Sequence, residues 1–417
     1  MESVETLIIG AGISGLTYAS ETKEDYLIVE AESRPGGLCK SFYQDDFIWD
    51  YAGHFFHFSN PIIKNMFVQE IDPNEIVECK KKTNIYYHGI EVSYPFQMNI
   101  HQLPKEEFID CLFDLFNRKN EDNYSSFQDM LYGKFGQSIT EKFLKPYNEK
   151  LYACNLKDLD QSAMGRFFPY ANIDDIIKNM KGNQYKAYNN TFQYPKSGAQ
   201  YYVDILLKNI DKNKILLNSR IKKIDINNKI AIVNGKEIGF TKLISTIPLN
   251  YFIRIISDKQ YANLYTDVLS CNKVLVFNLG FDKPAVDENI HWTYFPDKDI
   301  NFYRVGFYNN ILSSKKLSLY VEIGFGEKDI IDLDTQLQDT LLNLKKVGII
   351  TNHKLVAHNS LIINPGYVHI TSGSIEKVNQ LQNEFSKKNI FLTGRYGKWT
   401  YCSIEDCIYD AMVLAKN

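Results

Sequence analysis

The segment VETLIIGAGISGLTYAS, residues 4–20, joins an apolar run to three glycines and then to the start of a helical pattern. The apolar run predicts a buried strand, and the residues after the last glycine predict a helix. The glycines have GxGxxG spacing, in which the first permits a tight turn, the second admits a pyrophosphate and the third lets helix and strand pack closely. A helix N-terminus also attracts phosphate through its free N–H groups. The predicted phosphate-binding residues are Gly10, Gly12, Ile13, Ser14 and Gly15.

A second apolar run, DYLIVE at residues 25–30, ends in an acid and supports the same interpretation. Glu30 lies at the distance from the glycines where an acid accepts a hydrogen bond from a ribose hydroxyl. A glycine-rich turn between a strand and a helix can also be purely structural. Because strand, turn, helix and acid occur together, we predict a dinucleotide site that includes Glu30 and the neighbouring Ala31.

The next segment, AESRPGGLCKSF at residues 31–42, adds a cation and a second glycine turn. An adenosine diphosphate half alone does not require them, although a surface turn could have the same composition. The E-x3-R-x-G-G pattern resembles that of the FAD-binding superfamily of amine oxidases, protoporphyrinogen oxidase and sugar mutases. FAD is therefore favoured over NAD, and Arg34, Gly37 and Leu38 join the predicted cofactor site.

The bulk composition is that of a soluble globular protein. The chain has 417 residues, 44% apolar and 23% charged, with a net charge of −3, so no overall field attracts nucleic acid or anionic membranes. The seven cysteines form no CxxC pair or Cys/His ladder, which argues against a disulfide framework or a zinc site. Without an apolar run of about 18 residues no membrane span is expected, and without a basic, apolar leader we expect a cytoplasmic protein.

The order of strand-like and helical patterns predicts an α/β fold in which a Rossmann-like FAD-binding lobe is discontinuous. A helical lobe and a mixed or antiparallel sheet lobe interrupt it. The predicted segments are 1–82 (first FAD-lobe segment), 83–103 (sheet-lobe strand and base-binding segment), 104–182 (helical lobe), 183–265 (second FAD-lobe segment), 266–385 (antiparallel sheet and substrate lobe) and 386–417 (third FAD-lobe segment).

Three arginines stand among aromatic residues rather than in charge runs: Arg166, Arg304 and Arg395. An arginine with apolar neighbours usually has a fixed anionic partner, because its burial is otherwise unfavourable. A guanidinium matches phosphate oxygens in a bidentate manner, although cation–π packing is the structural alternative. Tyr367 and Tyr401 could offer hydroxyls to such a site or belong to the core.

Several longer segments occur in the order found in UDP-galactopyranose mutases, and the chain resembles that family from residue 6 to about residue 412. The matching segments are DYAGH (50–54), YPFQMNIHQLP (94–104), LKPYNEKLYA (144–153), NNTFQYPKSGAQ (189–200), LISTIPL (243–249), FYRV (302–305), GYVH (366–369) and GRYGKWTY (394–401). These segments are far more specific than a GxGxxG turn.

The resemblance implies a flavin-dependent interconversion of pyranose and furanose forms of a nucleotide sugar, with UDP-galactose first and another NDP-hexose second. Reduced FAD acts through N5 on the anomeric carbon, and no net oxidation occurs. NADPH is a possible external reductant, and the product feeds cell-surface glycan synthesis. The protein would then supply positioning and electrostatic stabilisation.

The resemblance also assigns roles to individual residues. The catalytic set is His54, Arg166, Arg304, Tyr367 and Tyr401, with the arginines and tyrosines on the diphosphate. The base pocket is Tyr94, Phe96, Gln97 and Asn99, and the residues bordering the sugar are Tyr147 and Asn148. The flavin-facing residues are Gly53, His54, Gly394, Arg395 and Glu405.

The chain departs from the family at some of these positions. Ala52 replaces a glycine before His54, and CSIED follows Tyr401, which places Glu405 and Asp406 near the predicted diphosphate and flavin. These changes leave the identity of the sugar open and, to a lesser degree, the identity of the base. An FAD-dependent oxidase or dehydrogenase for an amine or porphyrin-like substrate is the alternative, although it does not need two phosphate-clamping arginines. A non-catalytic FAD protein that assists a glycosyltransferase is the third interpretation.

Overall fold

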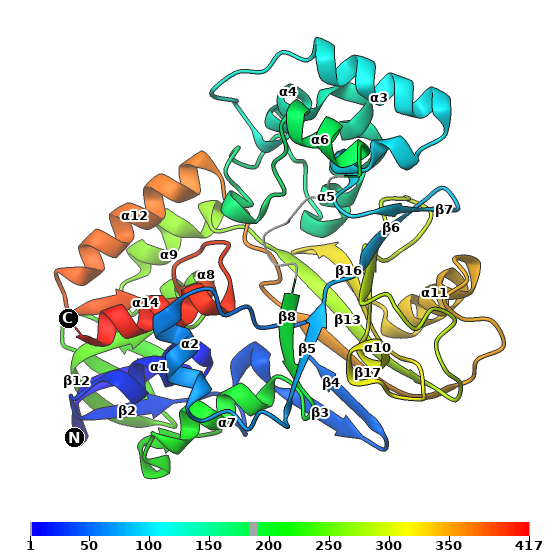
Figure 1. The fold of residues 1–417 in the computed structure, drawn as a ribbon. Helices are drawn as coiled ribbons and strands as arrows, with labels where there is room; N and C mark the ends of the chain where they lie inside the picture. Colours follow the sequence, from blue (N-terminus) through cyan, green and yellow to red (C-terminus); the bar gives the residue numbers. More distant parts are fainter. Residues whose placement is uncertain (1, 183–190, 417) are drawn as a thin grey trace.

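The computed structural model describes residues 2–182 and 191–416. The opening segment forms β1 (Glu2–Ile9), a glycine turn and α1 (Ile13–Glu21), as the sequence predicts. Residues 183–190, at the start of the predicted second FAD-lobe segment, lie outside the described residues. Figure 1 shows a sheet with β1, β2 and β12 at the lower left, a second sheet at the right and a group of helices at the top.

The first sheet collects strands from distant regions of the chain. In order, its strands are β10 (Ile221–Asp225), β11 (Ile230–Val233), β12 (Lys236–Ser245), β1, β2 (Tyr26–Val29) and β9 (Ile215–Leu216), with β18 (Ile390–Leu392) also paired to β12. β1 runs parallel to β2 and β12. The helices α1, α7 (Gln200–Lys208) and α14 (Ile404–Lys416) pack together beside it. The residues Leu7 and Ile8 of β1 are fully buried, which explains their continuous apolar pattern.

The second sheet is mostly antiparallel. Its order is β17 (Leu355–Ile363), β13 (Asn272–Phe281), β16 (Ser318–Gly326), β15 (Arg304–Phe307), β14 (Trp292–Tyr294), β6 (Thr83–Tyr87) and β7 (Ile90–Ser93). β14 and β6 are parallel, so the sheet is mixed. α11 (Leu333–Lys346) places Leu344 in a core cluster with the sheet residues Leu275 and Val321.

The helices at the top of Figure 1 come from one stretch of chain. They are α3 (Lys105–Asn117), α4 (Phe127–Ile139), a π-helical turn (Thr140–Leu144), α5 (Lys145–Tyr152) and α6 (Ile173–Met180). Pro104 precedes α3, and two acids occupy its first turn, which suits the positive end of the helix dipole. Gly136 interrupts α4 with φ +76°, and a Cβ there would lie 2.7 Å from the backbone of Asp114.

Short elements connect these regions. They are β3 (Ser41–Gln44), β4 (Phe47–Asp50), α2 (Pro61–Val68), β5 (Ile76–Lys80), β8 (Thr191–Pro195), α8 (Leu249–Ile255), α9 (Lys259–Tyr265), α10 (Tyr308–Leu312), α12 (Ser372–Ser386) and α13 (Gly394–Gly397). The predicted α/β class with a mixed sheet is confirmed. Among residues 2–182 and 191–416, no helix has the length and apolar character needed to cross a bilayer.

Candidate active site

The first glycine turn has the geometry that its sequence predicts. Gly10 has φ +98°, in the region that favours glycine, and a Cβ on Gly15 would lie 2.0 Å from the carbonyl oxygen of Gly10. No side chain fits at Gly15 without moving α1 away from the turn. The first glycine therefore allows the bend, and the third allows the helix to approach.

The second glycine turn packs directly against the first. The Gly36 N–H donates to the carbonyl oxygen of Ala11 at 2.8 Å, and a Cβ on Gly37 would lie 3.1 Å from the Cα of Gly12. Arg34 donates to the carbonyl oxygen of Ser41 and so holds the far side of this turn. Two backbone turns in contact form a surface without side chains, which suits a pyrophosphate.

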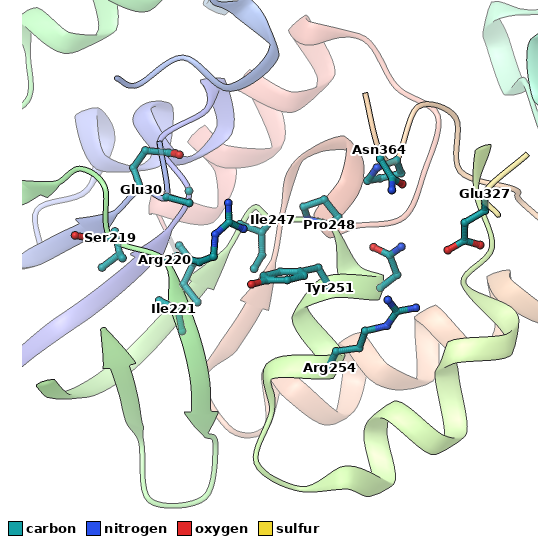
Figure 2. A pocket seen from close by; sticks show the side chains of 16 residues that line it. Glu30, Ser219, Arg220, Ile221, Ile247, Pro248, Tyr251, Arg254, Glu327 and Asn364 are labelled. Carbon is teal, nitrogen blue, oxygen red and sulfur yellow. The ribbon is translucent and has the colours of Figure 1, made fainter. Parts of the chain in front are cut away.

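A cavity of about 310 Å³ opens beside the carboxyl ends of β1 and β2 (Figure 2). Gly10, Glu30 and Ala31 line it. The Glu30 carboxylate accepts N–H groups from Ala11 at 2.7 Å and Glu32 at 2.9 Å. Each oxygen keeps a second lone pair, so Glu30 both braces the glycine turn and can accept a ribose hydroxyl.

The opposite wall of this cavity was not predicted from the sequence. Ser219, Arg220 and Tyr251 line it, and the Arg220 guanidinium lies 6.0 Å from the centre of the Tyr251 ring. Figure 2 shows the Arg220 side chain between Glu30 and Tyr251. These residues belong to no contiguous motif, so only the fold brings them to the glycine turns.

A group of tyrosines from separate segments surrounds Arg304, and we call it the tyrosine site. Its members are Tyr94, Tyr147, Tyr294, Tyr303, Tyr320, Tyr367 and Tyr401. The Tyr294 ring lies 5.0 Å from Tyr94 and 5.3 Å from Tyr147. Tyr367 and Tyr401 stack with centres 5.9 Å apart. The structure thus brings together Tyr94, Tyr147, Tyr367 and Tyr401, which the sequence resemblance had placed in one site.

Arg304 lies in this site with a fixed counter-ion. Its Nε and Nη2 both donate to the carboxylate of Glu322, with Nη2 at 2.7 Å from Oε1. Glu322 is 2% exposed, whereas the Arg304 side chain is 22% exposed. The buried carboxylate therefore holds the guanidinium, whose exposed part faces the tyrosine site. Tyr320 packs below the guanidinium at 5.9 Å.

Arg395 is the second cation of the site. Its guanidinium lies 4.6 Å from the centre of the Tyr401 ring and 5.3 Å from that of Tyr367. Within the described stretches of the chain it has no acidic partner, and its Nε is buried without a hydrogen bond. A half-buried cation with a buried, orphaned donor beside the glycine turns fits an electron-rich or anionic cofactor.

His54 lies close enough to both cations to feel their charges. Its Nδ1 is 3.1 Å from the carbonyl oxygen of Ala52. Burial, together with the charges of Arg395 and Arg304, lowers the pKa of His54 to about 4. The imidazole is therefore neutral at pH 7.

Gly53, which precedes this histidine, allows close packing against the tyrosine site because it has no side chain. A Cβ on Gly53 would lie 2.5 Å from the Tyr320 hydroxyl. Gly394, in the turn that carries Arg395, has φ +76°, and a Cβ there would lie 2.4 Å from the Ser14 hydroxyl. The C-terminal turn thus packs against the first residues of α1.

Arg166 lies at the edge of the tyrosine site rather than inside it. Its side chain is 49% exposed and its Nη2 donates to Asp406 at 2.6 Å. The guanidinium is 4.9 Å from the centre of the Phe167 ring, which contacts Tyr401 edge-on at 5.2 Å. Arg166 is thus connected to the site through Phe167 and to α14 through Asp406.

Other predicted substrate residues are packed into the interior of the helical region. Gln97 is fully buried and donates to the carbonyl oxygen of Pro169. Asn99 donates to Pro95 at 2.9 Å, and Asn148 donates to Leu144 at 2.6 Å. The amide nitrogens of these three residues have backbone partners, whereas the amide oxygens of Gln97 and Asn148 are buried without a hydrogen bond.

Phe96 and Glu405 also have structural partners. Phe96 is fully buried and stacks on Phe143 at 5.1 Å, which in turn stacks on Tyr147 at 5.3 Å. Phe96 therefore supports a ring of the tyrosine site without belonging to it. Glu405 accepts the N–H groups of Ser59 and Asn60, both at 2.7 Å, and so anchors the start of α2.

No local sequence signal pointed to Glu322, Tyr294, Tyr303 or Tyr320. Each lies in an ordinary strand pattern, where a buried acid or tyrosine is indistinguishable from a core residue. Only the pairing of β15 with β14 and β16 gathers them around Arg304. The described residues contain no group of three or more His, Cys, Asp or Glu side chains that could hold a metal ion.

Comparison with solved structures identifies proteins with the same fold. Reduced UDP-galactopyranose mutase superimposes with a TM-score of 0.92 at 22% identity, covering 99% of this chain and 95% of that chain. Cyclohexylamine oxidase from Brevibacterium oxydans gives 0.68 at 12% identity, covering 99% and 98%. A CLA-producing fatty acid isomerase from P. acnes gives 0.69 at 14% identity, covering 99% and 98%. The predicted resemblance is confirmed at the level of the fold, which an oxidase and an isomerase share.

A family model described as flavin containing amine oxidoreductase matches residues 13–413. This family implies FAD as the cofactor, and the glycine turns, Glu30, the cavity beside them and Arg395 with its orphaned donor fit such a dinucleotide. The match covers Gly15, the second glycine turn, the tyrosine site and most of α14 together. The chain belongs to the family of flavin-containing amine oxidoreductases.

Proposed function

We propose that the protein is a flavin-dependent nucleotide-sugar mutase that interconverts pyranose and furanose forms. UDP-galactose is the first candidate substrate, and another NDP-hexose is the second. The observation that carries the proposal is Arg304, a partly exposed cation held by a buried acid at the centre of a tyrosine-lined site. This arrangement suits a diphosphate better than an amine, because an amine would meet like charge.

Two arginines would neutralise the leaving diphosphate. Arg304 is fixed by two hydrogen bonds to Glu322, so its position requires no reorganisation when negative charge develops. Arg166 reaches the same site from its edge, through the Phe167 contact with Tyr401. Its ion pair with Asp406 limits the conformations of its long side chain.

Tyrosine hydroxyls would donate hydrogen bonds to the same oxygens. Burial raises the pKa of Tyr367 well above its ordinary value, and the nearby charge of Tyr401 acts in the same direction. Tyr367 therefore remains protonated over the physiological pH range and keeps its donor. Tyr94, Tyr147 and Tyr294 form half-buried aromatic surfaces on which a planar base can stack.

FAD, when bound and reduced, would supply a nucleophilic nitrogen for the anomeric carbon. Arg395 and the paired glycine turns would hold it, and neutral His54 would lie beside its ring with a hydrogen bond to Ala52 fixing the imidazole. The remaining protein groups position the sugar and exclude water. No residue in this scheme needs to change its oxidation state.

The test uses dithionite-reduced, FAD-loaded protein with a panel of UDP-, dTDP- and GDP-sugars under anaerobic conditions, with products identified by NMR. We expect furanose product without net flavin oxidation. Arg304→Ala and Arg166→Ala should each lower kcat by about 100-fold or more and retain bound FAD. Lys298→Ala, which removes an exposed cation outside the tyrosine site, is the matched control.

The same experiment separates the mutase from an oxidase. An oxidase would reduce FAD stoichiometrically with an amine or porphyrin-like substrate and reoxidise it with oxygen. Turnover of such a substrate without sugar isomerisation would overturn the proposal. Normal turnover in both arginine variants would overturn the assignment of the diphosphate clamp.

A further inference from the structure

Two thiols meet at the start of α14. The Sγ atoms of Cys402 and Cys407 are 3.5 Å apart, which is van der Waals contact. Of the described cysteines, Cys39, Cys79, Cys111 and Cys271 are buried and Cys154 is partly buried, while both members of this pair are partly buried. No other described cysteine has a second sulfur at hydrogen-bonding distance.

The capping of α14 explains why the thiols meet. The Ser403 hydroxyl accepts the N–H of Asp406 at 3.1 Å, and the Asp406 carboxylate accepts the N–H of Ser403 at 2.8 Å. This reciprocal pair is a capping box, and it makes Ser403 the N-cap. In such a cap, the residue just before the N-cap contacts the residue four positions after the N-cap, and both are normally apolar. Here both positions hold cysteine.

The surroundings also activate one thiol. The hydrogen bond from Cys402 lowers the pKa of Cys407, and a backbone hydrogen bond with Arg395, the charge of Arg395 and the hydroxyl of Ser14 act in the same direction. The N-terminus of α14 favours a thiolate for the same electrostatic reason. A purely structural pair of cysteines would be as well served by any small apolar residues, and would not need a position beside a cation.

We propose that Cys402 and Cys407 form a reversible dithiol–disulfide pair that closes when the protein meets a small oxidising disulfide. The Cys407 thiolate attacks one sulfur of oxidised glutathione, and one glutathione thiolate leaves. The Cys402 thiol then loses its proton and attacks the sulfur of Cys407, and the second glutathione leaves. Two protein thiols are oxidised to one disulfide, and one oxidised glutathione is reduced to two thiols.

Closure would act on the neighbouring binding groups. A disulfide requires the sulfurs to approach from 3.5 Å to about 2.05 Å, so the two side chains, with the segments on either side of the capping box, must adjust. Cys402 directly follows Tyr401, and Cys407 directly follows Asp406, the partner of Arg166. We expect the oxidised protein to bind UDP about 5- to 10-fold more weakly, because Tyr401 and the Asp406–Arg166 pair would shift relative to Arg304; this consequence rests on the proposed function.

The disulfide itself is tested without reference to activity. The FAD-loaded full chain is equilibrated in buffers of increasing ratio of oxidised to reduced glutathione, blocked with a maleimide, digested and mapped by mass spectrometry. We expect one Cys402–Cys407 disulfide that dithiothreitol reduces. The Cys154→Ser variant, which changes another partly buried cysteine, is the control and should form the same disulfide. Cys402→Ser should instead accumulate a glutathione adduct on Cys407.

Two outcomes would overturn the pair. Both thiols could remain free across the whole series in the wild-type protein, or a stable glutathione adduct could persist on one wild-type thiol without closure. Neither outcome depends on how well a variant folds. UDP titration of the oxidised and reduced wild-type protein then tests whether closure weakens UDP binding. Equal affinity in both states would overturn that effect but would not contradict the mapped disulfide.

Discussion

Arg304 and Glu322 stand directly opposite each other on the antiparallel strands β15 and β16, and they form a bidentate ion pair with Nη2 to Oε1 at 2.7 Å. Cross-strand neighbours point to the same face of a sheet, so the register alone brings acid and base together. Because Glu322 is 2% exposed, removing Arg304 leaves a buried carboxylate uncompensated, and removing Glu322 leaves a largely covered cation without its anion.

The first prediction concerns this pair. Glu322→Leu leaves the Arg304 cation unpaired and should lower the free energy of unfolding by about 3–5 kcal/mol. The double variant Arg304→Met, Glu322→Leu replaces the pair with apolar side chains and should recover most of that loss. Urea unfolding of the wild type, both single variants and the double variant measures the cycle. A double variant no more stable than Glu322→Leu would contradict the buried pair.

The second prediction concerns the glycine turn. Gly15→Ala places a methyl group where it meets the carbonyl oxygen of Gly10, so α1 must shift away from the turn. We expect about a 100-fold or greater loss of FAD affinity, seen as the flavin-to-protein absorbance ratio after gel filtration. Gly373→Ala in α12 is the control, since its added Cβ meets only the Thr371 hydroxyl at 3.9 Å. Wild-type flavin content in Gly15→Ala would show that the turn does not hold the cofactor.

The third prediction is a pH dependence of stability. Burial lowers the pKa of His54 to about 4, whereas an unfolded histidine titrates near 6.5. The unfolded chain therefore binds the proton first, and stability present above pH 6.5 is lost as the pH falls toward 4. Between pH 7 and pH 5 this histidine should account for about 2 kcal/mol of the loss.

The check is the difference between wild type and His54→Gln, measured by chemical unfolding at both pH values. The difference should shrink by that amount at the lower pH. His358→Gln, which changes an exposed histidine on β17, should show no such change. An identical pH slope in wild type and His54→Gln would mean that the imidazole is not held neutral in the folded protein.

The fourth prediction separates stacking from hydrogen bonding at the proposed base surface. Tyr147→Phe keeps the ring beside Tyr294 and should leave UDP affinity within about 3-fold, whereas Tyr147→Ala should weaken it about 10- to 100-fold. Gln97→Ala should reduce stability, because its buried amide donates to Pro169, with little effect on UDP affinity. Calorimetric titration with UDP measures all three. A larger loss for Gln97→Ala than for Tyr147→Ala would support the predicted base pocket at residues 94–99 over the surface formed by Tyr147 and Tyr294.

Features formed by residues adjacent in the chain could be predicted from the sequence. The strand, the GxGxxG turn, the helix and Glu30 lie within residues 2–30, and their requirements for apolar burial and for glycine are local. The α/β class and the interrupted first sheet followed from the same patterns. The resemblance of the longer segments to the mutase family predicted the fold of the remaining chain.

The surroundings of individual side chains were not readable in the same way. YPFQMNIHQLP contains amides and aromatic rings suited to a base, yet Phe96 and Gln97 are fully buried and Tyr94 alone of its rings reaches Tyr294. A polar residue in a loop can serve a ligand or satisfy a neighbouring carbonyl, and the local sequence does not distinguish these cases. Burial by distant helices decides between them.

The sequence by itself determined that this chain has a glycine-lined dinucleotide turn at its N-terminus, because that turn depends on residues adjacent in the chain. Only the tertiary structure decided that Arg304 faces Glu322, that Arg395 lies half-buried among tyrosines without an acid from the described residues, and that seven tyrosines share one site. The physical reason is that strand register and helix packing set which charges are desolvated together. Local periodicity specifies a buried face, but not the partner that meets it.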